Sequence, residues 1–401
     1  MSQTLLSPTI ITREALRVLH QSFTFIRAIN RQYDSRFANS GASMSGKIGP
    51  SLAIRNPNRF TVRTGAAINV QDITETSQTL TVSTQKGVDF KFTSQDLTLT
   101  IDQFAERYLR PAMSVLAAQV EADAISMYKD VYNLVDGDAA AFDFVHLTTA
   151  QEKLNNELAP TNDRTAILKN KHVNKFLVAT KGLFNPQGQL SKQFTGGVLG
   201  NIADFDIMAS SQLANHTTGT AAKTTGYLIN GASQTGAAMT VDTGSTTFLK
   251  GDVITIAGVN RVHPETKADS GELQQFVITA DSGASATSLA ISPSIVITGA
   301  TQNVSGSPAD NAAIVKIGAG ASELLDQTIA FQRDAFTFVT ADLEDVSKYG
   351  AWGARQVMDG ISMRIARQYD ITNDTVPARI DVLYGYKTIR PELAVRIHAD
   401  G

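Results

Sequence analysis

The 401-residue chain contains no cysteine. Disulfides, thiolate metal sites and a cysteine nucleophile are therefore excluded, and stability must come from packing or from association with other chains. Long apolar runs are also missing. The longest uncharged stretch, 282–309, is full of Ser, Thr, Gly, Asn and Pro, which a lipid-facing helix does not tolerate. No transmembrane helix is expected.

The N-terminus lacks the basic lead and apolar core of a secretory signal, because Arg13, Glu14 and Arg17 interrupt every candidate run. We therefore expect a protein made and kept in the cytoplasm. With 42% hydrophobic residues, 18% charged residues and a net charge of −3, the composition is that of an ordinary soluble protein. Charge is uneven, since residues 1–47 carry about +4 and the remainder about −7. The N-terminal segment is basic.

Motifs for catalysis and cofactor binding are missing or incomplete. No Gly-x-Ser-x-Gly elbow occurs, and the six histidines lack His-x-x-x-His spacing. Residues 41–48 match a phosphate-binding loop except for its final Ser or Thr, but the strand and helix that must flank this loop are not predicted. A flexible hinge explains these residues better. We predict no catalytic residue, no metal site and no cofactor.

From Thr12 to about Tyr33, apolar residues recur at helical spacing with arginines between them, which predicts an amphipathic helix after a Thr N-cap. Two interpretations remain open at this point. The helix packs on its own domain, or it is an arm that binds a partner or a neighbouring subunit. The candidates for partner binding are Arg13, Arg17, Phe23, Arg27 and Arg31.

Residues 47–93 change to a period of two. Ile54, Phe60 and Val62 fall on one face and three arginines on the other, which predicts a strand with a basic face. Alternation on both sides of 85–87 predicts a hairpin with its turn there. Isolated hairpins are marginal in water, so a neighbouring subunit is expected to hold this β-loop. The arginines, Arg55, Arg59 and Arg63, suit phosphate contacts or, better, ion pairs with an acidic surface.

A capping box at Thr100–Gln103 opens a helical stripe that reaches Tyr132, the longest helix predicted. Shorter elements follow: a helix at 148–157 and strands at 175–180 and 205–209, which together indicate an α/β domain. Strand patterns return after residue 331 and continue to 397.

Between Ser210 and Gly320 the chain is crowded with Ser, Thr, Gly and Ala and contains three aromatic residues, Tyr227, Phe248 and Phe276. Short strands at 251–258, 275–279 and 288–292 predict a small β-barrel or sandwich. The flanking segments are mixed apolar and charged, like two halves of one domain. The segment is therefore predicted to be an insertion.

Four strings, in this order and spacing, resemble the major coat proteins of tailed bacteriophages. They are IDQFAERYLRPA at 101–112, GVLGNIADFDIMASSQL at 197–213, IAFQRDAFTFVT at 329–340 and YGYKTIRPELAVRI at 384–397. The resemblance is to the P-twenty-two-like coat family, whose subunits have the Hong Kong 97-type capsid fold with an inserted domain.

That resemblance implies an α+β Hong Kong 97-type fold with an inserted small β-barrel. Its parts would be an N-terminal arm at 1–46, an extended loop at 47–93, a spine helix and peripheral domain at 94–139, an axial domain at 140–212 and 321–348, the inserted domain at 213–320, and peripheral C-terminal strands at 349–401. The sequence departs from the family pattern at 230–244. Some family members carry a charged loop there that joins neighbouring capsomers, but here Asp242 is the only charged residue, so this contact is not expected.

The implied function is a major capsid protein that self-assembles into the icosahedral head shell around double-stranded DNA, without enzymatic activity. Its partners would be itself, as hexamers and pentamers, a scaffolding protein, a portal protein and DNA bound without sequence specificity, but no membrane. Assembly is expected in the bacterial cytoplasm, and the product is the virion capsid. Subunit-interface candidates are Arg55, Arg59, Arg63, Lys86 and Lys91, the two lysines by location only.

A β-rich surface or tail adhesin is the alternative, prompted by the Ser/Thr/Gly-rich segment. The missing export signal and the mixed α/β remainder argue against it. The hypothesis of a hydrolase or nucleotide-dependent enzyme depends on the incomplete phosphate-binding loop at 41–48 alone.

Overall fold

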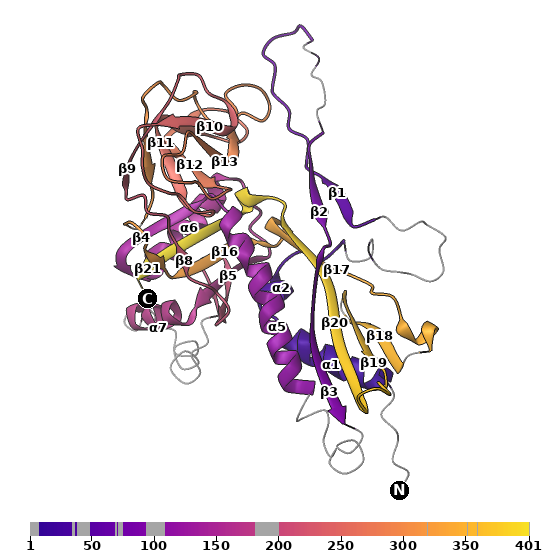
Figure 1. Cartoon of the computed structure of the whole chain (residues 1–401). Helices are drawn as coiled ribbons and strands as arrows, with labels where there is room; N and C mark the ends of the chain where they lie inside the picture. Colours follow the sequence, from indigo (N-terminus) through magenta and orange to yellow (C-terminus); the bar gives the residue numbers. More distant parts are fainter. Residues whose placement is uncertain are drawn as a thin grey trace. The chain divides into compact units, whose positions relative to one another are not determined.

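The computed structural model describes residues 8–33, 37, 49–68, 70, 75–93, 109–180, 200–318, 320–350, 352–358 and 360–400. The chain is a mixture of helices and strands that forms two compact units (Figure 1). The first unit comprises Met1–Arg55, Ser77–Ile125 and Phe336–Lys387, and the second comprises Asn56–Thr76, Ser126–Ala335 and Thr388–Gly401. Each unit therefore combines segments that are far apart in the sequence.

A five-stranded sheet organises the first unit, with strand order β17–β20–β19–β18 and with β3 also paired to β20. Its strands are β3 (Thr84–Thr93), β17 (Phe336–Ala341), β18 (Trp352–Met358), β19 (Ile361–Arg367) and β20 (Thr375–Thr388). Helix α1 (Pro8–Ser22) packs on β18, β19 and α5 (Arg110–Ile125) (Figure 1). The sheet, α1 and α5 thus share one core.

The N-terminal segment packs on its own unit, but it is not the single helix predicted after Thr12. Helix α1 is already formed at Pro8, so Thr12 is an interior residue and not an N-cap. A second short helix, α2 (Phe25–Ala28), follows a break. Glu121 of α5 stabilises the chain at this break. Its buried carboxylate accepts hydrogen bonds from the backbone N–H groups of Thr24 (2.8 Å) and Phe25 (2.6 Å), which begin α2.

Strands β1 (Ser51–Arg55) and β2 (Ser77–Thr81) form a two-stranded antiparallel sheet, with Ser51 opposite Thr81. The strand predicted to run on to residue 63 ends at Arg55, so that prediction is wrong beyond this point. The turn predicted at 85–87 is also wrong, because these residues lie inside β3.

Gly87 has a different role from the predicted turn glycine. It lies opposite Asp381 in the β3–β20 pair, and a Cβ added there would be 2.5 Å from the backbone oxygen of Ile380. Glycine is therefore needed for close approach of two strands and not for a reversal of the chain.

Helix α5 (Arg110–Ile125) corresponds to the long helix predicted from Thr100 to Tyr132. It ends at Ile125 and is followed by the 3-10 turn η2 (Ser126–Asp130). The capping box at 100–103 and the loop-like residues 41–48 lie outside the described residues.

The second unit contains a six-stranded sheet of order β4–β21–β16–β5–β7–β6. Its strands are β4 (Leu134–Ala141), β5 (Arg164–Lys169), β6 (Asn201–Ile202), β7 (Phe205–Ser210), β16 (Gln327–Gln332) and β21 (Ala394–Asp400). The strand predicted at 205–209 is confirmed as β7. Pairs β4–β21 and β5–β7 are parallel, whereas β16–β21, β16–β5 and β6–β7 are antiparallel.

Two helices accompany this sheet. Helix α6 (Phe144–Asn156) confirms the helix predicted at 148–157 and begins earlier, because Asp143 caps it by accepting from the N–H groups of Val145 and His146. The strand predicted at 175–180 is wrong, since this segment belongs to helix α7 (Asn170–Thr180). Among the side chains of α7 that the structure describes, those of His172 and Phe176 are fully buried, and their separation of four residues is helical spacing.

A closed barrel of order β10–β13–β12–β11–β14–β9 also belongs to the second unit (Figure 1). Its strands are β9 (Thr224–Ile229), β10 (Gly236–Asp242), β11 (Val253–Val262), β12 (Asp269–Ile278), β13 (Ser288–Ile295) and β14 (Ala313–Lys316). All three aromatic residues of the Ser/Thr/Gly-rich segment lie in its core. The chain enters through β8 (His216–Thr217) and leaves through β15 (Leu324–Leu325), and these two strands pair antiparallel. We call this pair the neck.

The close approach at Gly87 gives a first prediction. Gly87→Ala should lower the free energy of unfolding by about 1–3 kcal/mol, because the added methyl group meets the backbone of β20. Urea denaturation followed by circular dichroism measures the change. Gly306→Ala is the matched control, since a Cβ at this position has no neighbour within 4 Å. Equal stability of the two variants would contradict the packing argument.

Candidate functional site

The segment between β1 and β2 carries an unusual amount of exposed apolar surface. Phe60 is 60% exposed, Val62 98%, Ile68 83% and Val70 83%. Four apolar side chains of this one segment are thus mostly open to solvent in the single chain. Ile54, by contrast, is buried in β1, so the predicted continuous face from Ile54 to Val62 is wrong. We call residues 56–70 the exposed loop.

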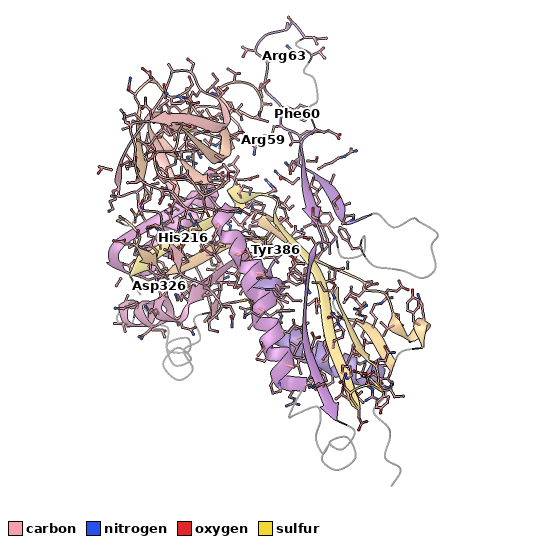
Figure 2. All side chains as sticks on the ribbon, in the orientation of Figure 1. Arg59, Phe60, Arg63, His216, Asp326 and Tyr386 are labelled. Carbon is pink, nitrogen blue, oxygen red and sulfur yellow. The ribbon has the colours of Figure 1, made fainter. Side chains whose placement is uncertain are left out.

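The three arginines predicted to form one basic face have separate surroundings. Arg55 is exposed at the end of β1. The Arg59 guanidinium lies 4.0 Å from the Glu392 carboxylate, and Arg63 donates a hydrogen bond to the backbone oxygen of Gly65. Figure 2 shows Arg59, Phe60 and Arg63 along the exposed loop. Cationic and apolar side chains are therefore neighbours on the same loop.

The two candidate lysines, Lys86 and Lys91, also have different surroundings. Lys86 forms an ion pair with Asp123 of α5 at 2.6 Å, and Asp123 also accepts a hydrogen bond from the Tyr384 hydroxyl at 2.5 Å. Burial, the hydrogen bond to Asp123 and its charge raise the pKa of Tyr384. Lys86 thus joins β3 to α5 within one subunit. Lys91 is exposed and lies opposite Pro377.

The basic residues of the N-terminal segment lie mainly at its surface. Arg13, Arg17 and Arg27 are exposed and Arg31 is half-buried. Arg17 pairs with Glu14 at 2.6 Å, which satisfies part of this charge. Phe23 is 2% exposed and lies in the core of the first unit. The structure therefore contradicts its assignment to a partner-binding surface.

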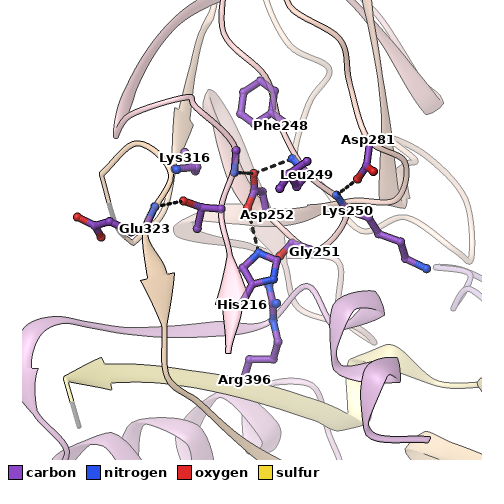
Figure 3. A network of polar contacts seen from close by, with 12 residues as sticks. His216, Phe248, Leu249, Lys250, Gly251, Asp252, Asp281, Lys316, Glu323 and Arg396 are labelled. Atoms are coloured by element: carbon purple, nitrogen blue, oxygen red, sulfur yellow. Dashed lines mark hydrogen bonds and ion pairs between the residues drawn. The ribbon is translucent and has the colours of Figure 1, made fainter. Parts of the chain in front are cut away.

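The barrel contacts the rest of the second unit through the loop Leu249–Asp252, which we call the base loop (Figure 3). The Asp252 carboxylate accepts hydrogen bonds from His216 Nε2 at 3.0 Å and from the backbone N–H of Gly219 at 3.0 Å. Arg396 of β21 donates to the Gly251 backbone oxygen at 2.6 Å. Lys250 pairs with Asp130 of η2 at 2.9 Å. Consecutive residues of one loop thus bind three different segments.

A second contact lies on strand β12. The Gln275 amide accepts from the Leu134 N–H at 2.7 Å and donates to the Leu134 oxygen at 3.0 Å, so it pairs with the backbone of β4 as a neighbouring strand would. Beside it, Tyr132 and Leu134 pack on Val253 and Val277. We call the surface that the barrel contacts, formed by Asp130, Tyr132, Leu134 and Arg396, the seat. Its side at Tyr132 and Leu134 is apolar, whereas its side at the base loop is charged.

Three of the histidines are paired with carboxylates rather than arranged for metal binding. His146 lies 2.7 Å from Asp143, and His398 lies 2.9 Å from Asp136; His216 is the third. Among the described residues, no group of three or more His, Asp or Glu side chains is placed to hold a metal ion. The pairs of His216 and His398 join residues 36 and 262 positions apart, so no local spacing in the sequence predicts them.

No helix in the described part of the chain is long and apolar enough to cross a membrane.

Comparison with solved structures places the fold among those of phage chains. A chain from Mycobacterium phage Che8 is 13% identical with a TM-score of 0.50, over 93% of this chain and 90% of that chain. The capsid structure of the Cyanophage P-SCSP1u is 12% identical with a TM-score of 0.45, over 88% and 84%. The CUS-3 coat protein I-domain is 30% identical with a TM-score of 0.20, over 23% of this chain and 96% of that one.

Comparison with curated proteins gives no match. The family model described as P22 coat protein, gene protein 5, matches residues 61–397. This match covers most of the chain, including the barrel and the sheets of both units. The chain therefore belongs to the P22 coat protein family and is a shell-forming coat protein of a bacteriophage.

Proposed function

We propose that the chain is the repeating subunit of an icosahedral phage head that encloses double-stranded DNA, and that it has the Hong Kong 97-type fold. The observation that carries this proposal is the exposed loop, whose four apolar side chains are largely exposed in the single chain. A surface or tail adhesin is not supported, because the family match includes the Ser/Thr/Gly-rich segment that suggested it.

Each part of the Hong Kong 97-type fold would correspond to an element of this chain. The exposed loop with β1 and β2 is the extended loop, and α5 is the spine helix. The first unit is the peripheral domain, the six-stranded sheet belongs to the axial domain, and the barrel is the inserted domain. The role is structural, without catalysis or a cofactor.

Assembly then follows from burial of the exposed loop on a neighbouring subunit. Covering a Phe or Val side chain is worth about 1.5–3 kcal/mol, so one loop makes a moderate contact. A closed shell repeats this contact in every subunit, and many moderate contacts together become strong. Arg55, Arg59 and Arg63 would add ion pairs at the rim of the contact and fix its register.

The subunit would also bind partners other than itself. The exposed arginines of α1 and Lys91 are candidates for contact with an acidic scaffolding protein, a portal protein or DNA without sequence specificity. Assembly would take place in the host cytoplasm. A charged contact from 230–244 is not supported, because the Gln234 side chain closes this loop by bonding the backbone of Asn230, Gly231 and Thr240.

The loop proposal is tested by removing its apolar side chains. The double variant Phe60→Ser/Val62→Ser should leave the free energy of unfolding unchanged within about 0.5 kcal/mol, since both side chains are exposed. Shell formation should be lost or need at least a roughly ten-fold higher protein concentration, because about 3 kcal/mol or more is removed from each contact.

Negative-stain microscopy and sedimentation velocity report the shells. The matched control is Val145→Ser/Val178→Ser, which removes two exposed apolar side chains from α6 and α7. Normal shells from the loop variant, or equal loss in the control, would contradict a specific role of the loop.

The arginines are tested by reversing their charge. The triple variant Arg55→Glu/Arg59→Glu/Arg63→Glu should block assembly while the single chain stays folded, because like charges would then face an acidic neighbour. The triple Gln variant should weaken assembly several-fold, since each exposed ion pair is worth about 0.2–1 kcal/mol. Light scattering against protein concentration measures both. Unchanged assembly of the Glu variant would exclude these side chains from the interface.

A further inference from the structure

The barrel is connected to its unit by the neck, by the base loop and by the contact of β12 with β4. In the neck, Thr218 N–H donates to the Glu323 oxygen at 2.9 Å and Ser322 N–H donates to the Gly219 oxygen at 3.0 Å, which extends the pairing of β8 and β15. The neck is thus a continuous two-stranded tether. It holds the barrel in place only if another contact fixes the direction of the tether.

His216 lies in the neck and makes one such contact. Its ring is almost completely buried and is 3.0 Å from Asp252 in the base loop through Nε2 and 3.4 Å from the Tyr128 hydroxyl of η2 through Nδ1. Asp252 is held ionised, because its hydrogen bonds to His216 and the backbone outweigh burial and lower its pKa. A carboxylate can only accept, so Nε2 carries the proton and Nδ1 is free to accept from Tyr128.

The charged groups around His216 come from each element packed on it. Asp252 faces it from the base loop and Arg396 from β21 (Figure 3). Lys129 of η2 is the third charged group that acts on it. Arg396 is fully buried and its pKa falls to about 10, but it remains a cation at neutral pH. Burial lowers the pKa of His216, the Asp252 hydrogen bond opposes this, and the charges of Arg396 and Lys129 lower it further.

We infer that His216 is an acid-sensitive clasp between the base loop of the barrel and η2. Neutral His216 links the neck, the base loop and Tyr128. A proton on Nδ1 removes the acceptor for the Tyr128 hydroxyl and places a second cation beside Arg396. The base loop then loosens, while the packing of Tyr132 on Val253 and Val277 makes no bond to His216 and stays closed. The charged groups that act on Tyr132 are Glu157, Glu392, Arg59 and Arg261, and burial raises the pKa of Glu157.

The direction of the pH effect follows from the lowered pKa of His216. The released state, in which the ring meets water, takes up the proton near the ordinary value of about 6.5. The clasp is therefore fully closed above that pH and is lost as the pH falls toward the lower pKa of the clasped ring. One proton is involved, so the change is at most roughly ten-fold for each pH unit.

Hydrogen exchange followed by mass spectrometry tests the clasp on the full chain between pH 7.5 and 5. Protection, corrected for the intrinsic exchange rate, should fall in the base loop by up to about ten-fold per pH unit below about 6.5. The amide of Leu134, bonded to Gln275 on the apolar side, should keep its protection. Equal loss at both places, or none in the base loop, would overturn the inference.

His216→Gln should remove the pH dependence in the base loop. His172→Gln is the matched control, because burial also lowers the pKa of His172, but its ring bonds Thr328 and Ala399 away from the seat. The control should keep the pH dependence. If His216→Gln does not fold, Lys129→Gln decides, because removing this cation raises the pKa of the clasped His216 and should make the total acid-induced loss smaller. An unchanged loss would contradict the clasp.

Discussion

The pairing of β3 with β20 is the interaction on which the first unit depends. It runs without interruption from Thr93 opposite Thr375 to Thr84 opposite Tyr384, and so joins segments almost 300 residues apart along the chain. Because β20 also pairs with β19, and β3 is tied to α5 through Lys86 and Asp123, the helix and the C-terminal strands are positioned by this one ladder. Gly87 allows the backbones of β3 and β20 to approach closely enough, and Gly385, just beyond this ladder, allows β20 to approach the backbone of Thr81 in β2.

A chain without cysteine needs other joints between distant segments, and buried charged side chains provide several of them. Glu121 holds α2 against α5, at the cost of burial that raises its pKa. Arg164 binds the backbone oxygens of Ala159 and Pro160 after α6, and Arg396 binds the base loop. Each of these charges donates to or accepts from backbone groups, which fixes direction as well as distance.

Sequence patterns predicted the elements whose neighbours are local or whose alternation is strong, such as α6, β7 and the barrel strands β11, β12 and β13. They failed where a distant partner decides the outcome. Gln85–Gly87 has the composition of a turn, yet β20 keeps it in a strand. Phe23 lies in a basic segment, yet it is part of the core. The pairs of His216 with Asp252 and of His398 with Asp136 have no local spacing that a sequence pattern could detect.

The neck gives the barrel the properties of an exchangeable module. Its entering and leaving strands are hydrogen-bonded neighbours, and paired strands lie about 4.8 Å apart. A polypeptide of any length whose ends lie that close can occupy the same place without moving β7 or β16. The neck therefore restricts an inserted domain only through the separation of its two ends. Any domain that replaced the barrel would also have to supply partners for the buried Arg396 and for the backbone of Leu134, which the barrel provides through Gly251 and Gln275.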